Sequence, residues 1–202
     1  MIYNSIDSRR FVPAEERQRA VLRKQFGLPA DAVIFCFVGS GFERKGLASA
    51  IRAIAGTSTW LVVVGQDKAE SRYRDLARSL GCEGQIRFLG MQKETLPFYQ
   101  LSDGLLLPTL YDPFPNVILE AMACGLPVIT SESCGGSEFI EQGQNGFYCD
   151  ALDIRTLKEA VMSIPSLEKN NNMGLVARER VREATPEKLS SQLITLYQKL
   201  LD

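Results

Sequence analysis

Continuous apolar runs recur along the chain and are bounded by glycine or proline. The strong runs, followed by a weaker last one, are Val33–Val38, Leu61–Val64, Ile86–Leu89, Leu105–Leu107, Val128–Thr130 and Phe147–Cys149. Apolar and polar residues do not alternate within these runs, so each predicts a strand buried on both faces. Such strands are typical of a parallel sheet covered by helices on each side.

Helical patterns separate the predicted strands. They cover Gly46–Ala55, Glu70–Leu80, Thr95–Leu101, Val117–Cys124 and Ile154–Ile164, with a last helix from Thr185. Regular strand–helix alternation predicts an α/β fold with a Rossmann-like, doubly wound and mostly parallel sheet. A Thr-Pro pair is a good helix start, and the run Asn170–Asn172 predicts a turn. The last helix carries one leucine stripe, which needs an apolar partner: Leu189, Leu193, Leu196 and Leu200.

Ligands of open α/β sheets bind at the carboxyl ends of the strands. This rule predicts that four loops share one edge, and these loops are Gly39–Gly46, Gly65–Lys68, Gly90–Lys93 and Thr109–Asn116. The candidate chemistry lies on the same loops or directly after them.

The most informative segment places two acids, Asp112 and Glu120, around two prolines and Asn116. We expect Asn116 to cap a helix and Glu120 to lie in its first turn. Helix N-termini attract anions, so a carboxylate there is unusual if the ligand carries only phosphate. A ligand that also offers a diol explains it, because a carboxylate accepts from two hydroxyls. Phosphate together with sugar hydroxyls indicates a nucleotide or a nucleotide-sugar. The alternatives are a helix-dipole acid at Glu120 and a turn-forming Asp112.

Arg44 and Lys45 lie at the start of a predicted helix, where cations oppose the helix dipole. We interpret them as diphosphate ligands, because fixed cations stabilise a leaving diphosphate more than the bound substrate. A solvated pair beside Glu43 is the alternative. The preceding Gly39-Ser40-Gly41 matches neither the dinucleotide-binding glycine pattern nor the P-loop, which leaves a flexible donor-side loop.

Further candidates are backbone or packing contributions. The start of the helix at Pro115, Asn116 and Val117 would offer N–H groups to phosphate, except from the proline. Gly65 ends a strand and lets a ligand approach, or simply makes a turn. Met91 is expected either to contact the nucleobase of the ligand or to fill the core.

Composition narrows the function classes. The chain has 202 residues, a formal net charge of −1, five cysteines and no histidine. There is no basic excess for nucleic acid and no apolar run of membrane-spanning length. Cysteines without C-x-x-C pairs argue against structural zinc and favour reduced thiols in a cytoplasmic protein. No acid cluster has metal-binding spacing, so we expect neither a metal nor another cofactor.

The segment from Asp112 to Pro127 resembles the Glu-x7-Glu motif of retaining GT-B glycosyltransferases of the GT4 family, although the first acid is Asp where that family usually has Glu. The entry segment Tyr3–Asp7 resembles the start of that family's C-terminal domain. Two further segments resemble its donor-side loops, Val38–Gly46 and Val64–Lys68. The combination is most similar to lipopolysaccharide-core glucosyltransferases. The resemblance implies that Asp112 faces the transferred sugar and that Lys45 holds the diphosphate.

The resemblance also implies a domain organisation and an activity for the full enzyme. Residues 1–184 would be the donor-binding domain, the C-terminal half of a GT-B fold, and residues 185–202 a crossover-type helix. The full enzyme would transfer a hexose with retention, from UDP-glucose to a lipopolysaccharide-core or similar glycan. The acceptor would bind through a missing N-terminal half, and the chain alone would be inactive. The full-length enzyme would associate peripherally with the inner membrane. The alternatives are a GT-B-like sugar-nucleotide epimerase and a non-catalytic Rossmann-type module.

Overall fold

All six predicted strands form, and all lie parallel in one sheet. The computed structural model describes residues 3–201, and for residues 166–171 only the backbone. The strands are β1 (Ile34–Val38), β2 (Trp60–Val64), β3 (Ile86–Phe88), β4 (Gly104–Leu107), β5 (Val128–Ser131) and β6 (Gly146–Cys149). Their order is β3-β2-β1-β4-β5-β6, the doubly wound Rossmann order. The fold class predicted from the apolar runs is confirmed.

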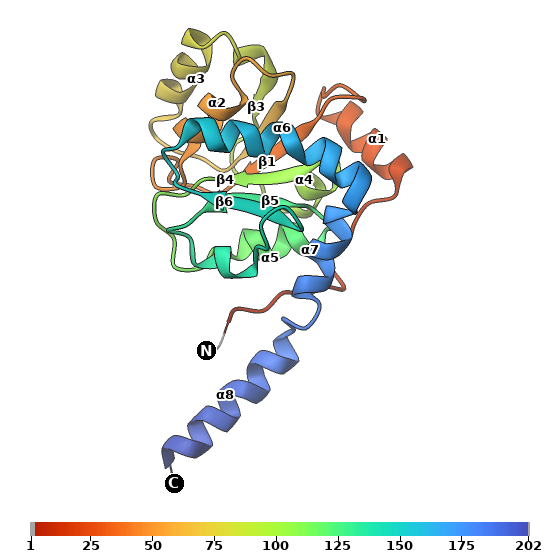
Figure 1. Ribbon diagram of the computed structural model, residues 1–202, viewed down its shortest axis with the longest axis vertical. Coiled ribbons are helices and arrows are strands. Elements are labelled where there is room, and N and C mark those ends of the chain that lie inside the picture. The colour runs from red at the N-terminus through yellow and green to blue at the C-terminus, as the bar shows by residue number, and fades with distance from the viewer. Residues whose placement is uncertain (1–2, 202) are drawn as a thin grey trace.

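Helices cover both faces of the sheet (Figure 1). On one face α2 (Leu47–Ile54) packs between α3 (Glu70–Ser79) and α6 (Ile154–Asn171). On the other, α1 (Glu16–Gln25) packs on α4 (Leu96–Leu101), and α5 (Asn116–Ala123) packs on α7 (Met173–Val181). Strands β1, β2, β4 and β5 are almost entirely buried, as continuous apolar runs require.

Two helices were not predicted from the sequence pattern. The helix α1 is mostly polar and buries only Leu22 and Arg23. The helix α7 follows Asn172, whose left-handed φ of 51° separates it from α6. The turn predicted over Asn170–Asn172 is therefore reduced to one residue, because α6 extends through Asn171 and only Asn172 breaks the helix.

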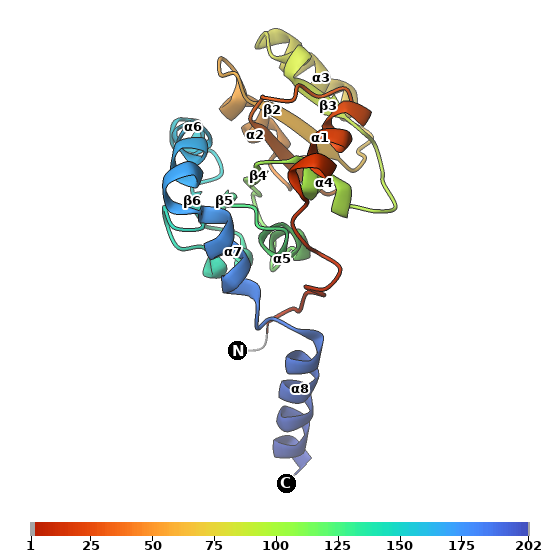
Figure 2. The same ribbon diagram turned by 90° about the vertical axis from the view of Figure 1, so that its right-hand side faces the viewer.

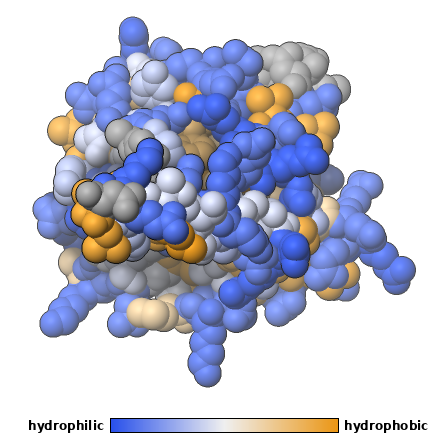
Figure 3. Space-filling model, turned by 90° about the horizontal axis from the view of Figure 1, so that it is seen from below, coloured by the Kyte–Doolittle hydropathy of each residue, from blue (hydrophilic) through white to orange (hydrophobic). Residues whose placement is uncertain are grey.

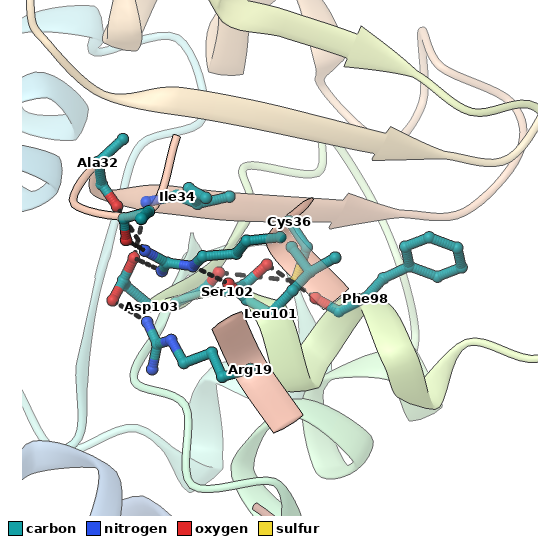
Figure 4. A network of polar contacts seen from close by, with 11 residues as sticks. Arg19, Ala32, Ile34, Cys36, Phe98, Leu101, Ser102 and Asp103 are labelled. Atoms are coloured by element: carbon teal, nitrogen blue, oxygen red, sulfur yellow. Dashed lines mark hydrogen bonds and ion pairs between the residues drawn. The ribbon is translucent and has the colours of Figure 1, made fainter. Parts of the chain in front are cut away.

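A polar network fastens α1 to the segments that lead into β1 and β4 (Figure 4). Arg23 donates to the carbonyl oxygens of Leu101 and Ala32 at 2.9 and 3.0 Å. It also contacts Asp103 at 2.8 Å, and that carboxylate accepts from the Ile34 N–H at 2.7 Å. Burial lowers the pKa of Arg23, while Asp103 opposes that shift. The network joins the amino ends of β1 and β4, opposite the edge where the site lies.

The last helix, α8 (Pro186–Leu201), projects away from the sheet (Figure 2). The predicted start is confirmed, since the Lys188 N–H donates to Thr185 Oγ1 at 3.2 Å. No α8 residue is buried, so the predicted leucine stripe does not pack into the core. Viewed from the α8 end, the surface is mostly hydrophilic with small separate apolar patches (Figure 3). Within the described residues, no helix has the length and apolar character needed to cross a membrane.

Candidate functional site

The candidate site lies at the boundary between β1 and β4, the two central strands, where the two halves of the sheet meet. From β1 the chain continues to β2 and β3, and from β4 to β5 and β6, so the carboxyl ends of β1 and β4 form the switch point. Neighbouring loops interlock along this edge. The Phe42 N–H donates to Asp67 Oδ2 at 2.8 Å, and the Gly65 N–H donates to the Gly90 oxygen at 2.9 Å. The prediction that these loops share one edge is confirmed.

An ion-pair cluster occupies the switch point. Lys45 Nζ and Arg44 Nη1 each lie 2.7 Å from the same oxygen, Oδ2 of Asp112. The Lys45 and Asp112 side chains are each 9% exposed, whereas the Arg44 side chain is 51% exposed. Residues 67 positions apart in the chain thus meet in one cluster. The alternative of a solvated Arg44–Lys45 pair is wrong for Lys45, which is buried.

The ion-pair cluster has more positive than negative groups, so it would attract an anionic ligand. Burial by itself would raise the pKa of Asp112, but hydrogen bonds from Lys45 and Arg44 and their positive charges lower it overall. Asp112 is therefore ionised at neutral pH. Two cations share one carboxylate, so the cluster retains one excess positive charge.

The backbone fixes the cation loop against the loop that follows β4. Gly46 has a left-handed φ of 75°, and a Cβ there would lie 1.8 Å from the Pro108 oxygen. The Arg44 oxygen accepts from the Leu110 N–H and from Thr109 Oγ1, both at 2.8 Å. Only glycine at position 46 allows this approach.

A second backbone contact fixes the Asp112 loop. The Gly135 N–H donates to the backbone carbonyl oxygen of Asp112 at 2.9 Å, and a Cβ at Gly135 would lie 1.8 Å from the carbonyl oxygen of Pro113. A Cβ at Gly136 would lie 2.5 Å from Ile118 Cδ1. These glycines permit close packing.

Two other candidate glycines also pack within the protein. Gly39 has φ 141°, and a Cβ there would press on the Lys45 side chain at 3.2 Å from Cε. A Cβ at Gly65 would lie 2.3 Å from the Gly39 oxygen. Ser40 Oγ accepts from the Gln66 N–H at 3.3 Å. Gly39, Ser40 and Gly65 therefore shape the loops around Lys45, and their contact with a ligand stays a prediction.

The start of α5 differs from the prediction in two respects. Pro115 is the N-cap and Asn116 the first helical residue, so Asn116 does not cap the helix. Its side chain accepts a hydrogen bond from Asn4 Nδ2 at 2.8 Å. Glu120 is consequently the fifth helical residue and lies beyond the first turn. The first turn still presents the N–H groups of Asn116 and Val117, which have no intrahelical partner in any α-helix.

Two side chains contact Glu120, one from α4 and one from the residue that precedes α4 as its N-cap. Tyr99 donates its hydroxyl to Glu120 Oε2 at 2.7 Å, and Thr95 Oγ1 lies 3.4 Å from the same oxygen. Tyr99 is fully buried, and its pKa is raised well above the ordinary value by burial and by the Glu120 charge. Neither Tyr99 nor Thr95 was predicted to belong to the site. Their helical pattern in the sequence signals only core packing.

The remaining candidate, Met91, is 61% exposed, so its interpretation as core filler is wrong. It lies on the loop between β3 and α4, which leads to Thr95. A separate cavity of about 340 Å³ lies between the N-terminal segment and α8, lined among others by Tyr3, Glu138 and Lys188. It does not include the ion-pair cluster. Within the described residues, no group of three His, Cys, Asp or Glu side chains could hold a metal ion.

With this geometry established, comparison with known proteins identifies the family. Residues 18–188 match the family described as Glycosyl transferases group 1. The chain belongs to this family of glycosyltransferases. The ion-pair cluster lies within the matched residues.

Two characterised relatives cover almost the whole chain. It is 33% identical over 186 residues to the lipopolysaccharide core biosynthesis glycosyltransferase LpsE of Rhizobium meliloti, covering 90% of this chain and 53% of that protein. It is 31% identical over 206 residues to the N-acetyl-alpha-D-glucosaminyl L-malate synthase of Bacillus anthracis, covering 99% of this chain and 53% of that protein. The chain thus spans about half the length of these relatives.

Solved structures share the same fold. The sucrose-phosphate synthase of Thermosynechococcus elongatus has a TM-score of 0.85 at 28% identity, over 99% of this chain and 52% of that one. Anabaena Alr3699/HepE in complex with UDP and glucose has a TM-score of 0.84 at 22% identity, over 98% of this chain and 56% of that one. The fold of this chain is thus the fold of one half of GT-B glycosyltransferases.

Proposed function

We propose that this chain is the donor-nucleotide-sugar-binding half of a retaining hexosyltransferase. The observation that carries the proposal is the meeting of Arg44, Lys45 and Asp112 at the switch point of a glycosyltransferase-family sheet. An excess positive charge beside a helix N-terminus matches a diphosphate. Glu120, one turn further along α5, matches the ribose hydroxyls.

Each group is assigned to one part of a nucleotide-sugar. In this proposal Asp112 would bind the sugar, and Lys45 with the α5 N-terminus would bind the diphosphate. Glu120 would bind the ribose, and Met91, which is exposed, would contact the nucleobase. Lys45 and Arg44 would stabilise the diphosphate as its bond to the sugar breaks and its negative charge grows. No metal is needed in this scheme, because the cations and the helix dipole supply the positive charge.

We propose UDP-glucose as the donor and a lipopolysaccharide-core or similar glycan as the acceptor. The glucose donor is supported by the Anabaena structure that holds UDP and glucose, and the acceptor by the lipopolysaccharide-core relative. The acceptor would bind through a further N-terminal half of the enzyme, on the cytoplasmic side of the membrane and peripheral to it. The epimerase alternative is weaker here, because it requires an acid–base pair at the sugar and both cations hold Asp112.

Calorimetric titration of the chain tests this function. We expect UDP and UDP-glucose to bind with or without magnesium, and guanosine diphosphate to bind more weakly. We also expect no sugar transfer by the chain alone. Absence of UDP binding would contradict the assignment, and strict dependence on magnesium would contradict the metal-free scheme.

A further inference from the structure

The cations assigned to the diphosphate already have an anionic partner. Lys45 and Arg44 both contact Asp112 Oδ2 at 2.7 Å. The side chains of Lys45 and Asp112 are buried together, where water cannot replace a lost partner. A diphosphate that binds Lys45 must therefore displace this carboxylate or share the cation with it.

We propose that Asp112 is the internal anion of the diphosphate site and competes with the donor for Lys45 and Arg44. The inference rests on the proposed function. In the free protein the carboxylate neutralises Lys45 and holds Arg44, and the diphosphate takes its place. The displaced carboxylate is then available to accept hydrogen bonds from the hydroxyls of the sugar. Asp112 thus favours a ligand that carries both a diphosphate and a sugar over one that carries the diphosphate alone.

The surroundings allow the side chain to move while its backbone stays fixed. The backbone carbonyl oxygen of Asp112 accepts from the Gly135 N–H at 2.9 Å. The backbone N–H of Asp112 donates to the carbonyl oxygen of Ser133 at 3.4 Å. Release therefore requires only a rotation of the carboxylate away from Lys45. Arg44 is half exposed and can follow the incoming phosphate, whereas Lys45 is confined beside Gly39.

Competition makes a prediction opposite to that for an ordinary sugar-binding residue. If Asp112 only reads the sugar, Asp112→Asn leaves UDP affinity unchanged. If it competes for the cations, the ligand no longer has to break the ion pair, and the apparent affinity rises. We expect Asp112→Asn to bind UDP and inorganic pyrophosphate roughly three- to tenfold more tightly, the range of a partly buried ion pair. Uridine, which lacks phosphate, should be unaffected.

The matched control is Glu43→Gln. Glu43 is exposed and directly precedes Arg44, so this variant removes the same charge nearby while the ion pair stays intact. Its affinities should stay within about twofold of the wild type. An equal gain in both variants would mean that general electrostatics, and not the pair, sets the affinity, and would overturn the inference.

A double variant keeps the test valid if Asp112→Asn fails to fold with Lys45 unpaired. Lys45→Ala/Asp112→Asn contains neither buried charge, and it is compared with Lys45→Ala. A gain in UDP affinity that exceeds the change in Glu43→Gln, from release of Arg44 alone, supports the competition. Unchanged or weaker binding on removal of Asp112 overturns it. If the wild type binds pyrophosphate but not UDP, the proposed function fails. The ratio of the pyrophosphate affinities of Asp112→Asn and the wild type then still decides whether Asp112 competes.

Discussion

At the scale of single residues, Lys45 is unusual because it is a buried lysine on a loop. Gly39 packs against its stem, and Asp112 compensates its charge. Burying an ammonium is costly unless its charge is compensated, so a position of this kind favours an anion.

Replacement of Lys45 tests its role at the diphosphate. We expect Lys45→Ala to weaken UDP binding by about 1.5–3 kcal/mol, the contribution of a hydrogen bond to a charged group. Uridine should bind as before. Lys68→Ala is the control, because Lys68 is exposed on a neighbouring loop of the same edge. Calorimetry measures each affinity, and equal losses for UDP and uridine would contradict the assignment.

Replacement of Glu120 tests its role at the ribose. Glu120→Gln should bind 2′-deoxy-UDP better relative to UDP than the wild type does, because the carboxylate no longer accepts from the 2′-hydroxyl. Tyr99→Phe should change the same ratio by less, since Tyr99 only orients the carboxylate.

The control for Glu120 is Glu94→Gln, an exposed carboxylate on the loop before α4. If the ratio of UDP to 2′-deoxy-UDP affinity does not change in Glu120→Gln, the carboxylate is not at the ribose.

The sequence allowed some residues of the candidate site to be proposed and not others. Lys45, Asp112 and Glu120 are proposed from local spacing and from the rule that strand ends share an edge. Tyr99 lies in an ordinary apolar helix pattern, and only the packing of α4 beside α5 brings its hydroxyl to Glu120. The contact of Gly135 with Pro113 is likewise invisible in the sequence, because it depends on the pairing of distant loops.

At the scale of elements, the short segment after β5 positions the Asp112 loop. It includes a 3₁₀ turn, Gly135–Phe139, whose first two residues pack without room for a Cβ. Its contribution to the site is made by the backbone.

A methyl group at Gly135 tests this contact. Gly135→Ala would place a Cβ 1.8 Å from the Pro113 oxygen, so one of the two loops must move. We expect a loss of about 1–3 kcal/mol in the free energy of unfolding, together with weaker UDP binding. Gly84→Ala is the control, because a Cβ there meets nothing within 4 Å and the backbone needs no positive φ. Denaturant unfolding measures both variants, and equal stabilities would contradict the close contact.

The elements that the sequence did not predict are those held by tertiary contacts. The helix α1 has little apolar periodicity and is fastened by Arg23, whose partners come from distant segments. The helix α7 is buried through Met173, Ala177 and Val181 against α5. The strands were predicted because they are buried on both faces, which leaves a continuous apolar signal in the sequence.

At the scale of the whole molecule, α8 is separate from the core. Its exposed apolar residues include Ile194, Tyr197 and Leu200, and none of its side chains is buried. The helix therefore contributes little to the stability of this chain.

Shortening the chain tests that conclusion. A chain ending at Ala184 should unfold within about 2 °C of the full chain and bind UDP within about twofold, because surface changes away from packed groups cost little. A chain ending at Asn172 is the control, because it also lacks α7 and its buried Met173 and Val181. Thermal unfolding followed by circular dichroism distinguishes them. Marked destabilisation of the Ala184 form would show that α8 packs on the domain.

The seam between β1 and β4 has a consequence for folding. Only two residue pairs join these strands, Phe35 with Gly104 and Cys36 with Leu105, whereas five pairs join β1 to β2. The half of the chain with β1 to β3 carries the cations, and the half with β4 to β6 carries both acids. Neither half alone therefore contains the complete ion-pair cluster. Under the proposed function, a donor could bind only after the two halves have joined, so the pairing of β1 with β4 would be the step that completes the binding site.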